Sequence, residues 1–356
     1  RSTVANLIGR DFIPSDIYSK VTGRAKYAED IRMDGMLFCR LLKSPMPHAR
    51  VRGLDTSEAL SMEGVVAVLT ADEVPVTPGP SNNILTNEPH FVGEPILAVA
   101  AVSEKIAQDA IDRIKIDLEP LPFCLDPLES LRPEGANART DGNTIVSREG
   151  VQEIKWKEED FLQAAAGELP MGEPGAEWSY GDLEKDGASL ILDESFVTAS
   201  NAHHSMEPRS AMAFWQNGKC HVYGSSQSQA IVVPGLARYI GIEPEDLVFI
   251  GQYCGGGFGS KGSAYPLMAI PAHLSKKTNR PVLMRISRAE EYFLGSARIG
   301  FQGRVKLGFR DNGRIAAVDL YIVQENGQNT GFGDMGSAAD AVSLVYTPLA
   351  MRYRGI

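Results

Sequence analysis

The stretch Gly251–Gly262 has the sequence GQYCGGGFGSKG, and the interpretation of the whole chain starts from it. It follows the apolar segment Leu247–Ile250, which is typical of a strand, and precedes the segment Ala264–Lys276, which has helical character. Glycine alone tolerates positive φ angles freely and lets backbone N–H groups come close to an anion or a flat ligand. The stretch therefore predicts either a ligand-binding loop or a tight turn that serves packing only.

The same loop contains a G-x-G-x-x-G pattern at Gly257, Gly259 and Gly262, which would suggest a dinucleotide site. Three features argue against this: extra glycines before the pattern, two prolines after it, and no acidic residue about 20 positions further on to bind a ribose. A Walker loop is excluded because Lys261 follows Ser260 rather than a glycine. A nicotinamide-dependent dehydrogenase stays an alternative, which a nicotinamide titration would expose.

The composition bounds the class of protein. The chain has 356 residues, of which 43% are hydrophobic and 22% charged, as is typical of a globular chain with more than one core. The formal net charge is −10, and no basic cluster is longer than Lys276-Lys277, which disfavours a nucleic-acid partner. No uninterrupted apolar run approaches the roughly 18–20 residues of a membrane span, so we expect no membrane-spanning segment.

The four cysteines, Cys39, Cys124, Cys220 and Cys254, lie far apart and include no Cys-x-x-Cys pair. A disulfide framework, or an iron–sulfur cluster held by this chain alone, is therefore not expected. Reduced thiols predict an intracellular, cytoplasmic protein. Because the chain starts at Arg1 rather than Met, a removed leader and a periplasmic location stay open.

Changes in composition along the chain predict three parts. Residues 1–124 alternate strand-like and helix-like patterns, which predicts a compact α+β module. Residues 125–188 are rich in proline, glycine and charge, with one helix-like piece at Glu158–Ala166, and predict an extended connection over a surface or a partner. Residues 189–356 predict a second α+β module, which we expect to stop at Ile356 in the middle of a domain.

Periodicity and turn signals predict the main elements of both modules. The apolar run Pro95–Val102 predicts a buried strand, and Ser103 after it can cap a helix. Asp311-Asn312-Gly313, between segments of alternating polarity, predicts a hairpin. Further strands are predicted at Met36–Leu42, Val65–Leu69, Leu190–Ala199, Ala211–Trp215, Lys219–Gly224 and Leu247–Ile250, and helices at Ser228–Ile240 and Ala264–Lys276.

The segment GGGFGSK at Gly255–Lys261 resembles the pterin-binding glycine loop of the xanthine dehydrogenase/aldehyde oxidase family of molybdenum hydroxylases. The resemblance implies an α+β fold: a hammerhead α/β domain over residues 1–124, then the first half of a molybdopterin-binding α+β domain over 189–356. Other stretches resemble the family in the same order, namely Thr22–Asp30 (TGRAKYAED), Lys43–Val51 (KSPMPHARV), Phe91–Pro95 (FVGEP), Asn201–Ala211 (NAHHSMEPRSA) and Tyr223–Gln229 (YGSSQSQ).

The resemblance also implies a cofactor and a reaction. A molybdenum–molybdopterin group, the cytosine dinucleotide form being one option, would oxidise an aldehyde or an N-heterocycle with water as the oxygen source. Electrons would leave through 2Fe-2S clusters to FAD in partner subunits. By similarity, the Gln227 amide contacts an oxo ligand of the metal. The loop approaches the cofactor through Gly255, Gly256 and Gly257 and places the N–H groups of Phe258 and Gly259 against it, and Phe258 also walls the substrate channel.

Two departures from the family pattern limit this picture. Gly262 stands where the purine-oxidising members carry a substrate-binding glutamate, which favours an aldehyde or another apolar carbonyl or heterocycle. The family's catalytic base, a glutamate, is expected beyond Ile356, so we assign no catalytic residue to this chain and no side chain that binds the metal directly. The carboxy-terminal half of the pterin site would come from another chain or a further segment.

Several alternatives stay open. The chain could be a scaffold subunit that kept the fold without the chemistry, or part of an enzyme like carbon monoxide dehydrogenase. Adjacent His203 and His204 point to opposite faces if extended, so they are interpreted as hydrogen-bonding residues rather than a metal pair. The remaining interpretations are Glu207 as an ion-pair partner of Arg209 or Arg24, Cys254 as an inert small hydrophobe, and His48 and His90 as loop residues.

Overall fold

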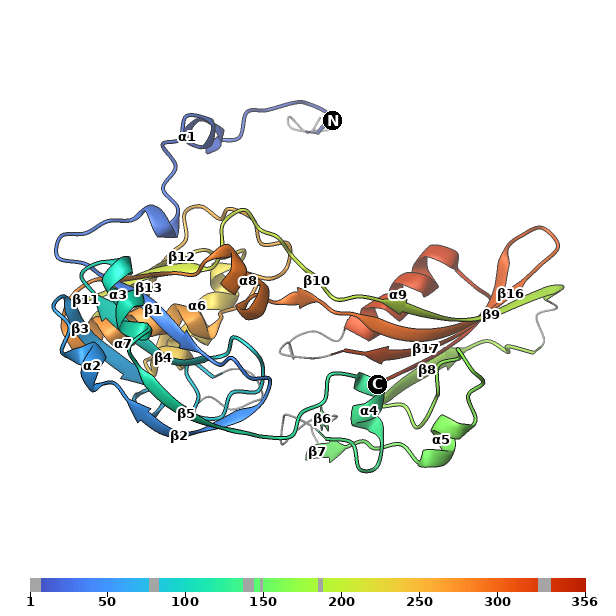
Figure 1. Ribbon diagram of the computed structural model, residues 1–356. Helices are drawn as coiled ribbons and strands as arrows, with labels where there is room; N and C mark the ends of the chain where they lie inside the picture. The colour runs from blue at the N-terminus through green and yellow to red at the C-terminus, as the bar shows by residue number, and fades with distance from the viewer. Residues whose placement is uncertain (1–7, 77–82, 137–143, 148–149, 185–187, 326–333) are drawn as a thin grey trace.

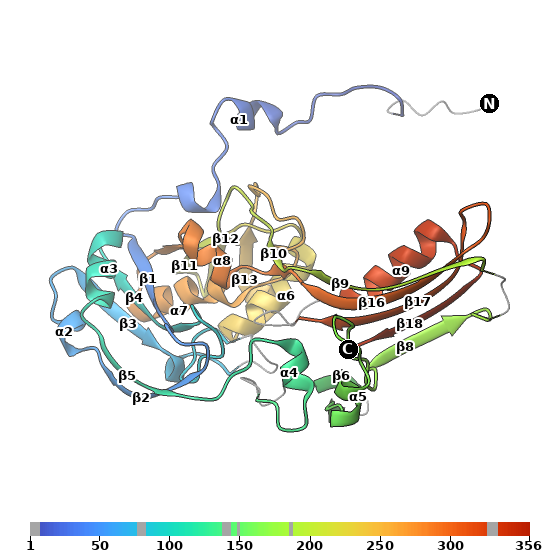
Figure 2. The ribbon, with the colours of Figure 1, turned by 45° about the vertical axis from the view of Figure 1, so that its right-hand side comes forward.

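The computed structural model describes residues 8–76, 83–136, 144–147, 150–184, 188–325 and 334–356. It has two lobes, one built on a seven-stranded sheet and one on a five-stranded sheet (Figures 1 and 2). An amino-terminal arm with the short helix α1 (Ile17–Val21) extends from the first lobe. Within the described residues, no helix is both long and apolar enough to cross a membrane.

The seven-stranded sheet combines strands from two separate ranges of the chain, residues 37–101 and 210–285. Its order is β13-β12-β11-β14-β1-β4-β3. The joint lies where β1 and β14 pair in parallel, with Leu37 opposite Val282 and Cys39 opposite Met284. The strands are β1 (Leu37–Lys43), β3 (Val65–Thr70), β4 (Pro95–Ala101), β11 (Ser210–Gln216), β12 (Lys219–Gly224), β13 (Leu247–Ile250) and β14 (Val282–Arg285).

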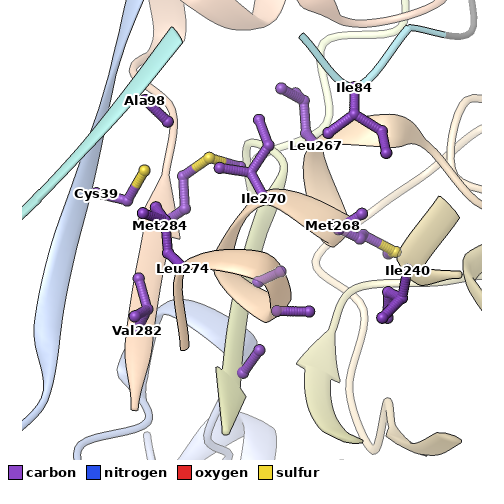
Figure 3. Close-up of a cluster of buried hydrophobic side chains, with 14 of the residues drawn as sticks. Cys39, Ile84, Ala98, Ile240, Leu267, Met268, Ile270, Leu274, Val282 and Met284 are labelled. Atoms are coloured by element: carbon purple, nitrogen blue, oxygen red, sulfur yellow. The ribbon is translucent and has the colours of Figure 1, made fainter. Parts of the chain in front are cut away.

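A shared hydrophobic core explains why the two ranges join. Cys39 and Ala98 from the first module pack in one cluster with Ile270 and Met284 from the second (Figure 3). Helix α7 (Ala269–Thr278) supplies the centre of this cluster and α6 (Gln229–Ile240) covers it further. Separating the ranges would expose this apolar surface, so the two parts of the sheet stabilise each other.

The remaining elements of the first lobe cover the sheet or flank it. The strands β2 and β5 pair with each other in a separate two-stranded sheet, and α3 packs against β1 and β4. The Ser103 hydroxyl accepts a hydrogen bond from Ile106 N, which confirms the predicted cap. The bounds are β2 (Ala49–Asp55), β5 (Lys115–Pro120), α2 (Ser57–Leu60), α3 (Glu104–Ile111), α8 (Arg288–Leu294) and the 3-10 turns Ala28–Asp30, Ala71–Glu73, Pro244–Asp246 and Pro266–Met268.

The five-stranded sheet of the second lobe has the order β8-β18-β17-β16-β9. Helix α9 packs on one face, against Leu320 and Tyr353, and α4 with its neighbours covers the other face, against Tyr321. The strands β10 and β15 pair between the lobes. The bounds are β8 (Ala176–Tyr180), β9 (Leu190–Thr198), β10 (Asn201–Ala202), β15 (Ala297–Arg298), β16 (Phe301–Phe309), β17 (Ile315–Gln324), β18 (Ala350–Gly355), α4 (Pro127–Leu131) and α9 (Asp334–Tyr346).

The segment 125–188 lies over the second sheet, and the expectation that it holds a single helical piece was wrong. It contains α4, α5 (Glu158–Leu162), the hairpin β6 (Thr144–Ser147) and β7 (Gly150–Glu153), and β8 at the sheet edge. Trp156 anchors it, because the indole is buried against Tyr321 and donates a hydrogen bond to the Glu173 carbonyl. The buried indole thus holds the chain near Trp156 and Glu173 against the sheet.

The other predicted elements match with small shifts. The hairpin at Asp311–Gly313 joins β16 to β17, with Gly313 at a φ of +78°. The segment predicted as one helix from Ala264 begins as a helix only at Ala269, after a 3-10 turn that Pro266 starts. The sequence analysis did not predict β14, β18, α8 or α9.

Candidate functional site

The glycine loop of residues 255–262 lies at the side of the first lobe, after β13 and before the turn that starts α7. Its backbone has positive φ angles at Gly256 (+105°), Phe258 (+52°) and Gly259 (+101°). A non-glycine residue in this region costs free energy, because Cβ crowds the backbone. The ring of Phe258 is 63% exposed, so burial in this chain does not compensate for that strain. Strain of this kind is typical of a site that positions a ligand.

Two other glycines are required by space rather than by φ. A Cβ at Gly255 would lie 2.4 Å from the Glu207 Cβ, and one at Gly257 would lie 2.3 Å from the Gln227 Oε1. Real Cβ atoms do not approach other atoms that closely. The run of three glycines therefore lets the loop contact Glu207 on one side and Gln227 on the other.

Gln227 lies between β12 and α6 and holds the loop through its amide oxygen. Its Oε1 accepts hydrogen bonds from Gly259 N at 2.9 Å and Lys261 N at 3.2 Å. Its backbone N donates to the Lys261 carbonyl at 2.9 Å. These bonds fix the orientation of the amide, and its Nε2 donor has no acceptor among the residues that the structure describes.

The loop also carries backbone donors that the described residues do not use. The N–H groups of Gly256, Gly257 and Phe258 donate to no acceptor in the described part of the chain. Successive backbone N–H groups in a glycine-rich loop can bind an anion. These N–H groups and Gln227 Nε2 are therefore candidate donors to a ligand.

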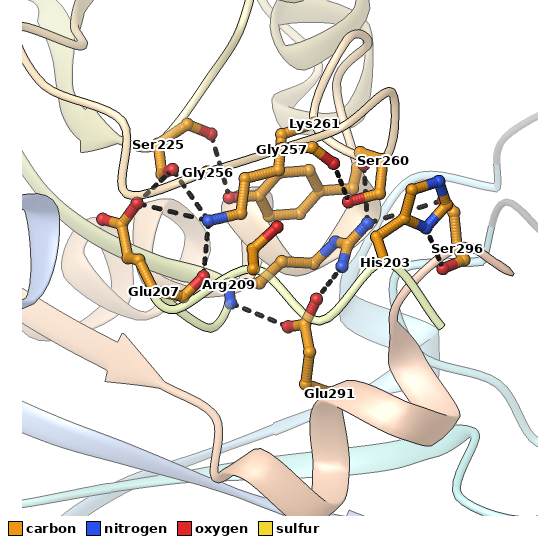
Figure 4. A network of polar contacts seen from close by, with 12 residues as sticks. His203, Glu207, Arg209, Ser225, Gly256, Gly257, Ser260, Lys261, Glu291 and Ser296 are labelled. Carbon is orange, nitrogen blue, oxygen red and sulfur yellow. Dashed lines mark hydrogen bonds and ion pairs between the residues drawn. The ribbon is translucent and has the colours of Figure 1, made fainter. Parts of the chain in front are cut away.

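A buried ion pair supports the loop from beneath (Figure 4). The Lys261 ammonium is 0% exposed and donates to the Glu207 carbonyl at 2.7 Å, the Glu207 Oε2 at 3.2 Å and the Ser225 Oγ at 3.0 Å. The same Oε2 accepts from Ser225 Oγ at 2.6 Å and from Gly255 N at 2.7 Å. A fully hydrogen-bonded ammonium and a carboxylate oxygen with three donors can remain charged away from water.

A second buried pair links the loop to α8. The Arg209 guanidinium bonds the carboxylate of Glu291 and donates to the Ser260 carbonyl at 2.6 Å. It lies over the ring of Tyr265, 5.1 Å from the ring centroid. Burial raises the pKa of the Tyr265 hydroxyl, which stays neutral and donates to the Ser225 carbonyl at 3.3 Å. The loop is thus fixed at Ser260 and Lys261, while Phe258 before them is exposed.

Several residues around the loop differ from expectation. Glu207 pairs with Lys261 and not with Arg209 or Arg24, because Arg209 is bonded to Glu291. The sequence pattern did not indicate Lys261 as the partner of Glu207.

The histidines and the cysteine near the loop make hydrogen bonds. His203 Nδ1 lies 2.9 Å from the Ser296 carbonyl oxygen, and His204 packs edge-on against Tyr292. Cys254 Sγ lies 3.4 Å from Ser225 Oγ. Arg298, which no sequence signal marked, donates to the Phe258 carbonyl at 2.7 Å.

Comparison with known families decides what kind of site this is. Residues 169–356 match the model described as the molybdopterin cofactor-binding domain, and residues 22–122 match the aldehyde oxidase and xanthine dehydrogenase a/b hammerhead domain. The chain belongs to the xanthine dehydrogenase/aldehyde oxidase family. The fold class inferred from the resemblance is confirmed, whereas the boundaries at 124 and 188 and the six site residues stay predictions.

Curated relatives and solved structures agree with this family. The chain is 29% identical over 317 residues to a probable xanthine dehydrogenase component from Bacillus subtilis, covering 86% of this chain and 39% of the relative. It is 26% identical to the "Carbon monoxide dehydrogenase large chain" of Afipia carboxidovorans, covering 86% and 38%. The quinoline 2-oxidoreductase of Pseudomonas putida superposes with a TM-score of 0.75 at 20% identity, over 98% of this chain and 44% of that one. The chain therefore spans less than half the length of these three relatives.

The residues present fit an anionic, flat cofactor. The molybdopterin-binding family model covers the loop and Gln227. The donors that lack an acceptor, Gly256 N, Gly257 N, Phe258 N and Gln227 Nε2, belong to the residues for which the family resemblance predicted cofactor contact. The buried cations Lys261 and Arg209 beneath them are matched by Glu207 and Glu291, so the base of the site adds no excess charge.

Proposed function

We propose that Gln227 and the loop Gly255–Gly259 form one side of the molybdenum–molybdopterin site of a hydroxylase. The observation that carries the proposal concerns the two ends of the Gln227 amide. Its Oε1 accepts two hydrogen bonds that fix the loop, while its Nε2 has no acceptor among the described residues. A loop needed only for packing would not require a further donor. The same holds for the backbone N–H groups of Gly256, Gly257 and Phe258.

When bound, the cofactor supplies the oxygen transfer and accepts the two electrons of the substrate. The residues of this chain bind and orient it. Gln227 Nε2 and the loop N–H groups donate to ligand oxygens, and the rigid base prevents the donors from moving when charge develops. The ring of Phe258, which is exposed in this chain, would cover the bound cofactor, exclude water and limit the substrate's approach.

For the substrate class we propose an aldehyde or an N-heterocycle. Gly262 carries no carboxylate, so a purine has no acidic partner at this position. Among the relatives are the "Aldehyde oxidoreductase" of Megalodesulfovibrio gigas, 27% identical over 336 residues, and the "Nicotine 6-hydroxylase large subunit" of Paenarthrobacter nicotinovorans, 26% identical over 342 residues. A carbon monoxide dehydrogenase-like activity is the second candidate, which the likeness to that enzyme's large chain supports.

The proposal includes partners. A second pterin-binding part with the base glutamate, a subunit with 2Fe-2S clusters and a subunit with FAD would complete the electron path. The words "large subunit" and "large chain" in the names of relatives support an assembly of several chains.

Gly257→Ala tests the loop with a single methyl group. The new Cβ would meet Gln227 Oε1 at 2.3 Å, so it must displace the amide that holds Gly259 N and Lys261 N. The matched control is Gly262→Ala, whose Cβ would approach only the Gly259 carbonyl, at 3.4 Å. Both proteins are isolated as the native complex, and molybdenum and pterin are measured per copy.

We expect molybdenum near one per copy in the wild type and in Gly262→Ala, and its loss in Gly257→Ala. The wild-type complex is then assayed with aldehydes, N-heterocycles and carbon monoxide. Full molybdenum in Gly257→Ala would show that the loop does not bind the cofactor. An intact wild-type complex without molybdenum would favour a scaffold subunit instead.

A further inference from the structure

Three side chains in the first lobe, far in sequence from the glycine loop, converge on one point. His48 immediately precedes β2, and Glu88 and His90 lie on the loop before β4. The His48 Nε2 lies 3.3 Å from the Glu88 Oε1, and the His90 Nε2 lies 3.9 Å from the same oxygen. One ligand atom from each residue falls within 4.8 Å of the other two.

These distances suit a small divalent cation. In a tetrahedral site with bonds of about 2.0–2.1 Å to imidazole nitrogen and carboxylate oxygen, neighbouring ligand atoms lie about 3.3–3.4 Å apart. The pair His48–Glu88 already has that separation, His90 needs to approach Glu88 by about half an ångström, and the ligand atoms of the two histidines lie within 4.8 Å of each other. Two imidazole nitrogens and one carboxylate oxygen are a donor set typical of zinc.

Hydrogen bonding orients His48 as it does in metal sites. Its Nδ1 lies 2.6 Å from the Pro122 carbonyl oxygen, and because a carbonyl only accepts, Nδ1 carries the proton. With the proton on Nδ1, Nε2 faces the Glu88 oxygen at 3.3 Å, and this contact is favourable when either a second proton on Nε2 or a metal ion lies between the two atoms. A metal-binding histidine usually donates its other ring N–H to a backbone carbonyl in this way.

Glu88 is held as an ionised ligand. Arg50 donates to its Oε2 from Nε at 3.0 Å and from Nη2 at 2.8 Å, which leaves Oε1 directed at the histidines. A carboxylate fixed by a second partner is the usual companion of a metal-binding histidine.

The backbone around the three residues is also fixed before any ion arrives. Ala49 N donates to the Pro89 carbonyl at 3.1 Å, and Leu121 N donates to the His48 carbonyl at 3.0 Å. The His90 N–H donates to Glu94 Oε2 at 2.6 Å. Binding therefore needs little ordering of the chain, which favours affinity.

We propose that His48, Glu88 and His90 bind one zinc ion, with water or an external ligand in the fourth position. The side chain of Glu88 is 33% exposed and that of His90 21%, so the fourth position is accessible from solvent. The ion would tie the start of β2 to the loop before β4 and, through His48, to the chain at Pro122 that leaves β5. It would stabilise this part of the lobe.

The test uses the purified full-length protein after treatment with EDTA and gel filtration. Zinc retained per chain is measured by elemental analysis after incubation with one equivalent of Zn²⁺, and affinity is measured by calorimetric titration. His90→Gln removes a partly exposed ligand. The control is His221→Gln, because His221 lies in β12 and stacks on Phe214 of β11, away from the proposed site. Co²⁺ is added in place of zinc as a spectroscopic probe.

We expect one zinc per chain in the wild type and in His221→Gln, and a loss of affinity of at least about 100-fold in His90→Gln. The thermal midpoint should rise with zinc in the first two proteins and not in the third. Absence of retained zinc in the wild type, or equal zinc affinity in His90→Gln, would overturn the proposal and leave an ion pair of protonated His48 with Glu88. Thiolate charge-transfer bands with Co²⁺ would also overturn it, because they would place the ion on a cysteine.

Discussion

The glycine-loop region and the five-stranded sheet both contain ion pairs, but they bury them to different degrees. Beneath the loop, Lys261 and Glu207 are 0% and 5% exposed. On the five-stranded sheet, Asp319 pairs with Arg352 and Arg354, and these three side chains are 18–43% exposed. In one region the charges are isolated from water, and in the other they remain in contact with it.

The difference indicates what each region is built to do. Hydrophobic contacts already hold the second lobe, where Tyr321 packs on one face and Tyr353 on the other, so its position does not depend on its ion pairs alone. The loop has almost no apolar side chain of its own, since Phe258 is exposed. Its position therefore depends on hydrogen bonds to buried charges, which are directional and fix a geometry that apolar packing cannot.

Lys261→Met should have the largest effect. It leaves the Glu207 carboxylate buried without its cation, and loss of one partner of a buried pair costs about 3–5 kcal/mol. We expect the free energy of unfolding, measured in urea, to fall by about that amount, and cofactor retention to be lost as well.

The double variant Lys261→Met with Glu207→Gln should recover part of that stability, because the uncompensated charge is then gone. A cost below about 1 kcal/mol for Lys261→Met, the range of exposed pairs, would mean that water reaches Glu207 and that the two regions do not differ.

Asp319→Asn should have an intermediate effect, of about 1–3 kcal/mol, because it removes charge-assisted hydrogen bonds from a half-buried site. Desolvation raises the pKa of Asp319, but the bonds from Arg352 and Arg354 outweigh it and hold the pKa below its ordinary value of 3.8. The stabilisation is therefore complete above that value and is lost as the pH falls through the lower pKa of the folded state.

Urea unfolding of wild type and Asp319→Asn between neutral and acidic pH measures this contribution. The difference in stability should be largest near neutral pH and shrink in acid. A difference that does not change with pH would assign the cost to lost packing rather than to charge.

Arg304→Met should have the smallest effect, about 0–1 kcal/mol. Arg304 bridges Asp193 at 2.8 Å and Glu168 at 3.0 Å, but the side chains of these partners are 34% and 41% exposed and are hydrated once it is removed. The urea midpoint at neutral pH is the measurement. A loss above about 2 kcal/mol would show that this surface pair is structural and would weaken the contrast with Lys261.

Local patterns in the sequence were sufficient for most elements and for the loop. The capped helix after Ser103 and the hairpin at Asp311–Gly313 depend on residues adjacent in the chain, and both formed where expected. The order of motifs from Thr22 to Lys261 was enough to indicate the family, which the matches over residues 22–122 and 169–356 confirmed. The positive φ angles at Gly256 and Gly259 were also expected from the sequence, because glycine tolerates such angles freely.

Only the tertiary structure decided which distant groups meet. The parallel pairing of β1 with β14 joins residues more than 240 positions apart, and no local pattern encodes that register. Glu207 pairs with Lys261 rather than with Arg209, because Arg209 already pairs with Glu291. His48 and His90 lie on loops, as predicted, but their convergence on Glu88 depends on contacts between distant segments, which the sequence pattern did not indicate. The periodicity of a sequence indicates which face of a helix or strand is buried. The hydrogen-bond partner of each buried polar group depends on every other buried group within reach, and these are known only from the tertiary structure.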